Sequence, residues 1–453
     1  MAATATRILC VLVPCQIAVA PILRDGPLNV DLWPCKAVIA LALGLAAAVL
    51  MPGKRPGLAS RRASPAILIH LALIVVCCCL SDTPELSFDA TWAVVTSTIV
   101  FLTFDRSASA RWIRNGLLAA GASLVLVAAV ALLQMLVIRN GWGHPVLLHL
   151  LPPESRVHFF EMDNTVGQAG VRLASVFFHS NQLGHFSAIS FAFFMPMLVY
   201  GARGRVRLAC GAALVLAVAC IFVAQSRGAI LVIVVQVLTA IILGYRPSFA
   251  TARTLLVVGG LGAACVLLFF RENLVPFLER LATFSLSSRE ILWERSLSLA
   301  TAHPMFGVGP GCSSHAILST HPPVDVRLLL DSYYARVPYD AWSNNPHNHY
   351  LTALMETGVL GLLLQVGAYG YYFVRAVSIL NSSRAPIIRS LAITAATVLG
   401  GEFVRGLFEA YCFLSAPETG VHVAFVLALV AFLDRRGPRT GRSAVQRRSA
   451  CAA

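Results

Sequence analysis

Four basic residues in polar stretches beside long apolar runs carry the chemistry that this sequence offers. They are Arg172 in R-L-A-S-V-F-F-H-S-N, Arg227 in Q-S-R-G, Arg289 in S-R-E-I-L-W-E-R-S and His347 in P-H-N-H-Y-L. Guanidinium groups fork onto phosphate oxygens and stay charged at physiological pH. An imidazole titrates near neutral pH and can take a proton from a hydroxyl group. These residue types therefore predict a site for a phosphate-bearing substrate and a hydroxyl-bearing one.

His347 stands where a polar segment becomes an apolar helix. Residues 346–364 read P-H-N-H-Y-L-T-A-L-M-E-T-G-V-L-G-L-L-L, and Pro346 and Asn348 are typical of a helix start. Backbone N–H groups at such a start favour anions. The alternative interpretation is a helix cap with an incidental histidine.

Arginine at a membrane edge is costly unless it has an anionic partner or reaches water. A lipid pyrophosphate places its charge at this depth, and negative charge grows on its bridging oxygen when it leaves a sugar carbon. Arg172 and Arg227 would stabilise that charge without a metal ion. Neutral His347 would be the base for the acceptor hydroxyl. The alternative for each arginine is snorkelling to the interface, and it weighs most for Arg289, which lies on an expected soluble amphipathic helix.

The composition identifies the class of protein. Of 453 residues, 57% are hydrophobic and only 12% are charged, as in a polytopic membrane protein. The net charge of +14 comes from arginines in short connections and in the tail, not from a basic face with interleaved aromatics, which argues against nucleic-acid binding. The twelve cysteines form no C-x-x-C pair, so no zinc ribbon or thioredoxin motif is supported. A bridge between Cys312 and Cys412 stays open.

Twelve apolar runs are candidates for membrane spans. They lie near 7–23, 35–51, 65–80, 90–104, 116–138, 183–200, 207–224, 228–244, 254–270, 349–374, 386–408 and 421–434. We therefore expect an all-α membrane bundle with four parts. These are residues 1–270 with nine spans and an exported loop at 139–182, a large helical exported loop at 271–348, three further spans in 349–434, and a basic tail at 435–453.

The connections alternate in charge, which predicts their orientation. Connections such as 54–62, 203–207 and 375–389 are basic, whereas 81–89, 139–182 and 271–348 are neutral or acidic. By the positive-inside rule both termini are cytoplasmic and the two long loops lie outside the cytoplasmic membrane, in agreement with an even number of spans. The four basic residues then face one compartment. We expect the side chains of Arg172, Arg227, His347 and His349 at the wet edge of the membrane.

Three further patterns have weaker implications. The glycines of H-P-M-F-G-V-G-P-G (303–311) neither follow a strand nor open a Rossmann helix, which favours a tight reversal at the bilayer surface over a phosphate loop. No H-E-x-x-H or comparable spacing supports a zinc site. Glu402, Arg405 and Glu409 follow i, i+3, i+7, so we expect them on one helix face, as a structural ion pair or in a substrate role.

The order of these motifs resembles the O-antigen ligase and O-antigen polymerase superfamily of bacterial membrane enzymes. The residues that carry the likeness are R-x-x-x-x-F-x-x-x-N from Arg172, S-R-G-A at Arg227, R-x-x-x-W from Arg289 with the following P-x-x-G-x-G, and H-N-x-Y-L-x-x-x-x-E-x-G-x-x-G from His347. The resemblance implies a GT-C-like architecture and a glycan donor linked to undecaprenyl pyrophosphate. Ligases of the superfamily move the glycan to lipid A–core, and polymerases join it to a second lipid-linked glycan.

The resemblance also implies roles for individual residues. His347 would be the catalytic base, and Arg172 and Arg227 would contact the pyrophosphate, with Arg289 beside them. His349, Asn348, Asn181 and Glu356 are further candidates in the same motifs. We expect neither a cofactor nor a metal ion.

The sequence thus predicts a metal-independent glycosyltransferase of the bacterial inner membrane with its active site facing the periplasm. Its expected partners are the undecaprenyl-pyrophosphate-linked glycan, an acceptor that is lipid A–core or a second lipid-linked glycan, and the lipid bilayer, but no nucleic acid. The choice between ligase and polymerase stays open. The alternative is a transporter or flippase of lipid-linked saccharide, which predicts charges spread through the spans and often an inverted repeat. Most charges here lie at one membrane face.

Overall fold

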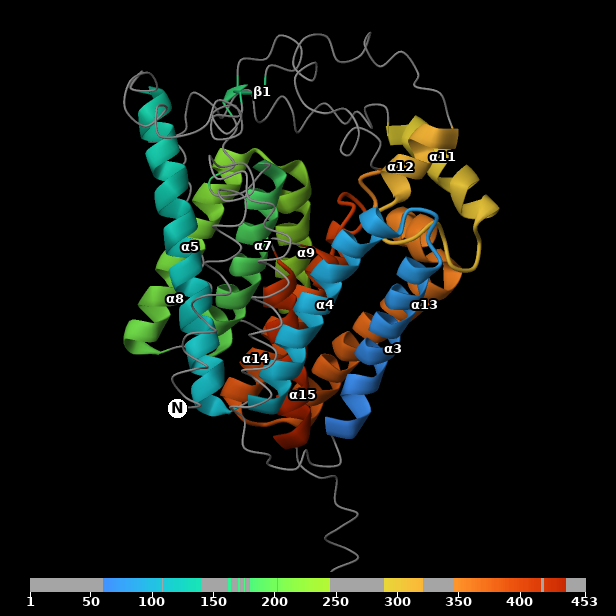
Figure 1. Ribbon diagram of the computed structural model, residues 1–453. Coiled ribbons are helices and arrows are strands. Elements are labelled where there is room, and N and C mark those ends of the chain that lie inside the picture. Colours follow the sequence, from blue (N-terminus) through green and yellow to red (C-terminus); the bar gives the residue numbers. More distant parts are fainter. Residues whose placement is uncertain are drawn as a thin grey trace, which may run out of the picture.

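The computed structural model describes residues 60–107, 109–139, 162–163, 170–171, 175, 180–201, 203–244, 289–320, 346–416 and 419–436. Over these residues the chain is almost entirely helical (Figure 1). The sheet that they contain is a short hairpin, in which β1 (Met162–Asp163) pairs antiparallel with β2 (Gly170–Val171). The all-helical, polytopic membrane class expected from composition is confirmed for this part of the chain.

The helices follow the apolar runs closely. They are α3 (Ser60–Cys79), α4 (Pro84–Ser107), α5 (Ala110–Arg139), α7 (Ser180–Pro196) with a π-helical extension (Met197–Gly201), α8 (Gly204–Ala224), α9 (Arg227–Gly244), α11 (Arg289–Ala302), α12 (Ser313–Thr320), α13 (His349–Ser382), α14 (Pro386–Arg405) and α15 (Gly420–Arg436). A 3-10 turn (Phe413–Ser415) lies between α14 and α15.

Six of the described helices are long and apolar enough to cross a membrane. They cover Trp112–Leu133, Ser180–Gly201, Gly204–Ala224, Arg227–Gly244, His349–Ser382 and Pro386–Arg405. Shorter apolar helices at Pro65–Cys79 and Ala90–Leu102 match two more expected spans, and α15 matches a third. The runs near 7–23, 35–51 and 254–270 lie outside the described residues, so the total of twelve stays a prediction.

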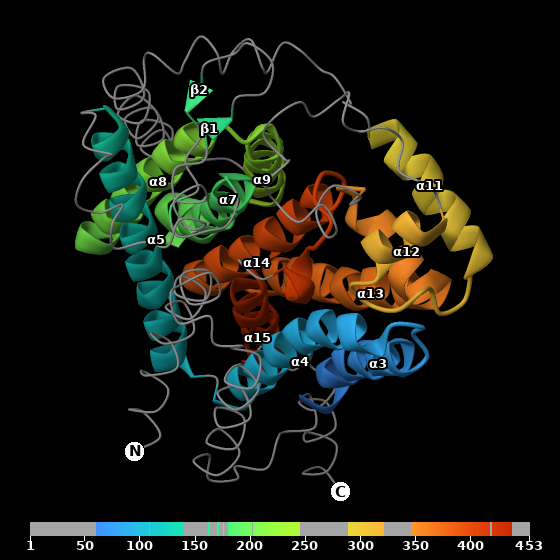
Figure 2. The same ribbon diagram turned by 45° about the horizontal axis from the view of Figure 1, so that its top comes forward.

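The bundle has a buried centre and lipid-facing flanks. Every described side chain of α15 from His422 to Leu433 is buried, and α15 packs on α4, α14 and α13 (Figures 1 and 2). Trp112 of α5 stacks on Phe425 of α15 with ring centroids 4.6 Å apart. In contrast, only 28% of the span in α5 and of that in α9 is buried. These flanks are apolar because lipid, rather than water, is their solvent.

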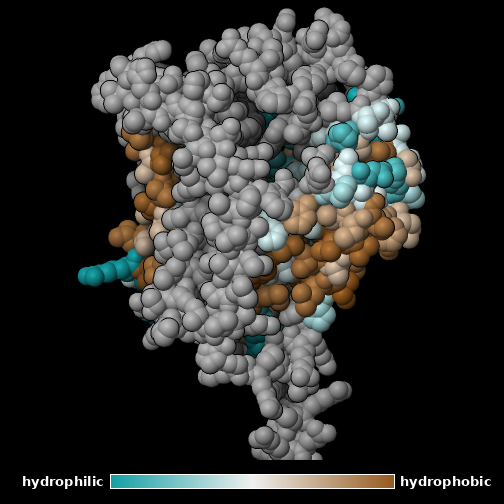
Figure 3. All heavy atoms as spheres, viewed as in Figure 1, coloured by the Kyte–Doolittle hydropathy of each residue, from teal (hydrophilic) through white to brown (hydrophobic). Residues whose placement is uncertain are grey.

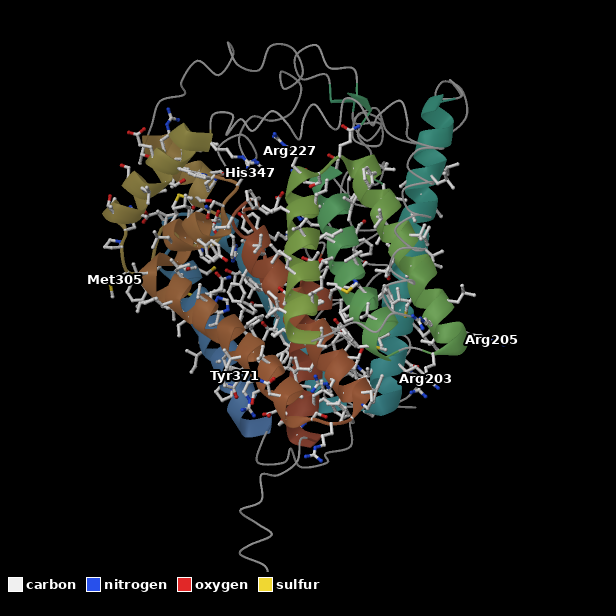
Figure 4. The ribbon with its side chains drawn as sticks, turned by 180° about the vertical axis from the view of Figure 1, so that it is seen from behind. Arg203, Arg205, Arg227, Met305, His347 and Tyr371 are labelled. Atoms are coloured by element: carbon white, nitrogen blue, oxygen red, sulfur yellow. The ribbon has the colours of Figure 1, made fainter. Side chains whose placement is uncertain are left out.

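Polar and apolar surfaces separate along the bundle. Figure 3 shows hydrophobic side chains over α3 and the adjoining part of α13, and hydrophilic ones over α11 above them. Figure 4 shows Arg203 and Arg205 at the end of the bundle opposite to Arg227 and His347. Two ion pairs join α4, α13 and α15, one between Arg435 and Asp105 and the other between Arg375 and Asp434. The expected sorting of the two groups of arginines between opposite ends is therefore present, while the side of the membrane that each end faces stays a prediction.

Candidate functional site at one end of the bundle

His347 is held in an unusual backbone conformation at the start of α13. Its φ is +46°, in the left-handed region that costs an L-residue about 1–2 kcal/mol. On one side, the indole N–H of Trp293 in α11 donates to the Pro346 carbonyl at 2.9 Å. On the other, the Asn348 side chain accepts from the N–H groups of Tyr350 and Leu351. The expected helix start at Asn348 is confirmed. Together, these bonds hold the backbone on both sides of His347 and so fix the position of its Cα atom.

His349 lies on a different face of the same helix. It is only 3% exposed, its backbone N–H donates to the Gly406 carbonyl at 2.7 Å, and its ring Nδ1 bonds the Ala410 carbonyl at 2.9 Å. The expectation that His349 lies at a wet membrane edge is therefore wrong. The helix period turns this residue inward, where its ring holds the segment that follows α14.

That segment, residues 406–413, is the 406 loop, and it carries Glu409. The expectation that Glu402, Arg405 and Glu409 share one helix face is wrong, because α14 ends at Arg405. The Glu409 carboxylate instead bonds Nε2 of His185, on α7, at 2.9 Å. The His185 side chain is 1% exposed and that of Glu409 19%, so this pair is largely shielded from water.

Several basic residues act on Glu409. Burial alone would raise the pKa of its carboxyl, but electrostatic interactions with His185, His347 and Arg405, together with the bond to His185, lower it to about 2. Burial lowers the pKa of Arg289 on α11, and the charge of Glu409 acts in the opposite direction. Glu409 is thus an ionised carboxylate within electrostatic reach of His347 and Arg289.

Arg227 is the first residue of α9, and its neighbour Gly228 packs against His185 and the 406 loop. The neighbouring Gly228 packs so closely that a Cβ there would lie 3.4 Å from Cε1 of His185 and 3.6 Å from Cβ of Phe408 in the 406 loop. The Arg227 side chain is exposed, and Figure 4 shows it and His347 at the same end of the bundle, near one another in that view. We call Arg227, His185, Arg289, His347 and Glu409 the site cluster.

The remaining expected site residues have different placements. Arg172 lies outside the described residues. Asn181 is half-buried at the second position of α7, one turn before His185. Asn348 caps α13, as described above.

Glu356 contacts the start of α12 and the 406 loop instead of the residues of the site cluster. It is 5% exposed and accepts from the Ser313 hydroxyl at 2.8 Å and from the Tyr411 hydroxyl at 3.3 Å. It also accepts from the backbone N–H groups of Gly311 and Ser313, at the start of α12. These bonds tie α13 to the start of α12 and to the 406 loop, which makes Glu356 a structural clamp.

Glu402 and Arg405 form a buried ion pair inside the bundle. Their closest N–O distance is 3.3 Å, Glu402 accepts from the Phe413 N–H, and Arg405 donates to the Tyr411 carbonyl and to Thr419. Both residues therefore hold the 406 loop in place through its backbone. Of the two alternatives that the sequence left open, a structural ion pair or a substrate role, this is the structural one.

Neither cysteine pairing nor metal clustering is present in the described part of the chain. Cys312 and Cys412 are both buried and are not joined by a disulfide, and Cys312 accepts a bond from the Thr83 hydroxyl. Among the described residues, no three His, Cys, Asp or Glu side chains come together in a way that could hold a metal ion.

Sequence reasoning missed His185 and misplaced Glu409. His185 lies four residues beyond Asn181, the last residue of the stretch quoted from Arg172, and thus on the same helix face. A cue was available for Glu409 too, since it follows Gly406, and glycine often ends a helix. Their contact, however, joins residues 224 apart in the chain.

Comparison with known proteins gives the site a family context. Residues 212–366 match the O-antigen ligase family, and this stretch includes Arg227, Arg289, His347 and Glu356. The chain is also 26% identical over 217 residues to the exopolysaccharide production protein ExoQ of Rhizobium meliloti (strain 1021). That alignment covers 46% of this chain and 46% of the relative, so it spans about half the length of either protein. The resemblance that the motifs predict is thereby confirmed over residues 212–366.

Proposed function

We propose that the protein is a membrane glycosyltransferase that moves a glycan from a lipid pyrophosphate to an acceptor hydroxyl. The donor would be an undecaprenyl-pyrophosphate-linked glycan, and the reaction would take place at the periplasmic face. The observation that carries the proposal is the site cluster, where the Glu409 carboxylate lies within electrostatic reach of His185, His347 and Arg289, and Arg227 lies at the same end of the bundle. The family match over Arg227, Arg289 and His347 supports it.

In the reaction, the acceptor oxygen forms a bond to the anomeric carbon of the donor glycan, and the bond from that carbon to the pyrophosphate oxygen breaks. Undecaprenyl pyrophosphate leaves with the electron pair. His347 takes the proton of the acceptor hydroxyl. Arg227 and Arg289, with Arg172 as a third candidate, stabilise the charge that grows on the leaving oxygen.

Glu409 would support the base. Its carboxylate lies within electrostatic reach of His347 and so stabilises the imidazolium that forms when the proton is taken, as the carboxylate of a catalytic triad does. The bond to His185 would hold that carboxylate in place.

The decisive experiment is transfer by the purified protein from a synthetic undecaprenyl-pyrophosphate-linked glycan. His347→Ala should lose about 10²–10⁴-fold in rate, whereas His315→Ala, on the exposed face of α12, should keep it. Near wild-type transfer by well-folded His347→Ala would overturn the role of His347 as a base. Movement of intact donor across proteoliposomes without any new glycosidic bond would indicate the transporter instead.

The acceptor distinguishes the two reactions that the family supports. Offered both lipid A–core and a second lipid-linked glycan, a polymerase should give a ladder of longer lipid-linked products and a ligase should give glycosylated lipid A–core. The relative named for exopolysaccharide production favours the polymerase. The family description favours the ligase.

We further propose that transfer needs no metal ion, because the arginines supply the positive charge that a metal would otherwise provide. Transfer should therefore survive an excess of EDTA. Loss of transfer with EDTA and its return with Zn²⁺ or Mg²⁺ would instead assign the histidines to a metal.

A further inference from the structure

The turn between α11 and α12 exposes two large apolar side chains. Met305 is 52% exposed and Phe306 is 39% exposed, and the preceding His303 and Pro304 are exposed as well. We call residues 303–306 the Met305 turn. Figure 4 shows Met305 pointing away from the bundle, at a height between His347, which precedes α13, and Tyr371 within α13.

The backbone around this turn is bonded to protein. The N–H of Gly307 donates to the His303 carbonyl at 3.1 Å. The N–H groups of Val308 and Gly309 donate to the carbonyls of Met355 and Glu356 in α13, at 2.8 and 3.0 Å. Pro304 has no N–H group to satisfy. These bonds satisfy the N–H groups of the three residues that follow Phe306, and irregular backbone near membrane depth needs such partners.

The turn also continues a lipid-facing surface. The Pro304 carbonyl accepts from the Val359 N–H at 2.9 Å, at the kink of α13 around Gly358. Val359 is 42% exposed and, one turn further on, Leu363 is 63% exposed. Met305 and Phe306 therefore adjoin the exposed apolar side chains of the membrane span in α13.

Charge is absent from this part of the sequence. No Lys, Arg, Asp or Glu occurs between Arg295 and Asp325. A loop that projects into water usually carries such residues, whereas a segment that meets hydrocarbon avoids them.

We propose that the Met305 turn inserts into the apolar edge of the bilayer leaflet on the His347 side and anchors α11 and α12 to it. Its partner is the acyl-chain region of phospholipid. The anchor ties the far end of the helix that carries Arg289 and Trp293 to the membrane. Trp293 bonds the Pro346 carbonyl, so the anchor would hold the neighbourhood of His347 at a constant depth.

Photocrosslinking tests the proposal without an activity assay. Benzoylphenylalanine replaces Phe306 in the full-length protein, which is reconstituted in phosphatidylethanolamine–phosphatidylglycerol vesicles, irradiated and analysed by mass spectrometry. Val359, on the exposed face of α13, is the positive control, and Ser319, exposed on α12, is the control for a water-facing site. The adduct fraction with phospholipid at position 306 should match that at 359 and exceed that at 319 several-fold.

Two results would overturn the proposal. One is a lipid adduct at position 306 no more abundant than at 319, which would place the turn in water. The other is a crosslink from 306 to another segment of this chain or to a second copy, which would show that protein covers it. Neither result bears on glycan transfer, so the anchor and the proposed function fail separately.

Discussion

At the scale of single residues, two histidines that lie two positions apart in the sequence have different environments. Asn348 caps α13 and leaves His347 before the helix, half-buried and in a left-handed conformation. His349 points into the bundle and bonds the Ala410 carbonyl. We therefore expect His349→Ala to disturb the 406 loop and lower protein stability, whereas His347→Ala should act mainly on the reaction.

Arg227→Lys should lower the rate of transfer by about 10²–10³-fold, because a point charge does not replace a guanidinium that forks onto a pyrophosphate. Membrane levels of the variant should be unchanged, since the side chain is exposed. The matched control is Arg203→Lys at the opposite end of the bundle (Figure 4), which should keep full activity. Equal rates for both variants would reduce Arg227 to an interface anchor.

Glu409→Gln should destabilise the protein at neutral pH. The folded state holds the pKa of Glu409 at about 2, below its ordinary value of 4.5. A lowered pKa stabilises the folded state above the unfolded value, and this contribution is lost as pH falls through the folded one. Wild type should therefore exceed the variant by on the order of 3 kcal/mol at pH 7.

The gap between wild type and Glu409→Gln should close as pH falls from about 4.5 towards 2. Thermal unfolding in detergent at a series of pH values measures it. A gap that stays constant across that range would show that the ionisation of Glu409 does not stabilise the fold.

At the scale of elements, α13 has a kink at Gly358, and the segment before α12 packs against this kink. Gly358 has φ +66° and ψ −172°, and the segment from Pro304 to Gly309 bonds the backbone groups that the break leaves free. The expected tight reversal at 303–311 is present, and its partner is this kink. The kink lets the first part of α13 lean on α11, where Trp293 reaches Pro346.

Gly358→Ala should destabilise the protein by about 1–3 kcal/mol and lower transfer with it. An added Cβ would lie 2.2 Å from the backbone of Met305, so the turn would have to move. Gly367→Ala, in the same helix with nothing within 4 Å of its added Cβ, should be neutral or stabilising by up to about 1 kcal/mol. Unfolding midpoints of the two variants check the contrast, and equal effects would contradict the kink as the cause.

At the scale of the whole molecule, two groups of charged residues lie at opposite ends of the bundle. The site cluster lies at one end, and Arg203 and Arg205 lie at the other (Figure 4). This arrangement suits an enzyme that works at one membrane face, because a path for a charged substrate would place charges along the full depth of the bundle. Within the described spans, Glu402 and Arg405 form a buried ion pair. Both side chains bond the backbone of the 406 loop, so this pair has a structural role.

Reporter fusions test the orientation of the whole chain. Fusions at Arg62, Arg205 and Arg384 should report cytoplasm, and fusions at Ser155 and Asp331 should report periplasm, because the basic connections stay inside. The fusion at Arg205 is the most informative. A periplasmic signal there would turn Arg227 and His347 to the cytoplasm and contradict the proposed site of reaction.

The sequence by itself determined the membrane class, the helices and the residues at their ends. Hydropathy, capping and loop charge depend on residues that are close together in the chain, so they can be predicted from short stretches of sequence. Asn348 at the start of α13 and Arg227 at the start of α9 were predicted for this reason. The motifs around them were enough to predict the resemblance to the O-antigen ligase family that the match over residues 212–366 confirms.

Tertiary structure alone decided which of these residues meet. Glu409 was expected on a helix with Glu402, but α14 ends before it, and the chain turns to bring its carboxylate to His185. His349 and Glu356 were expected at the site, but the helix directs one into the bundle and the other to the start of α12. The reason is physical: a buried charge must find its partner across space, and the partners here come from segments that no local pattern connects.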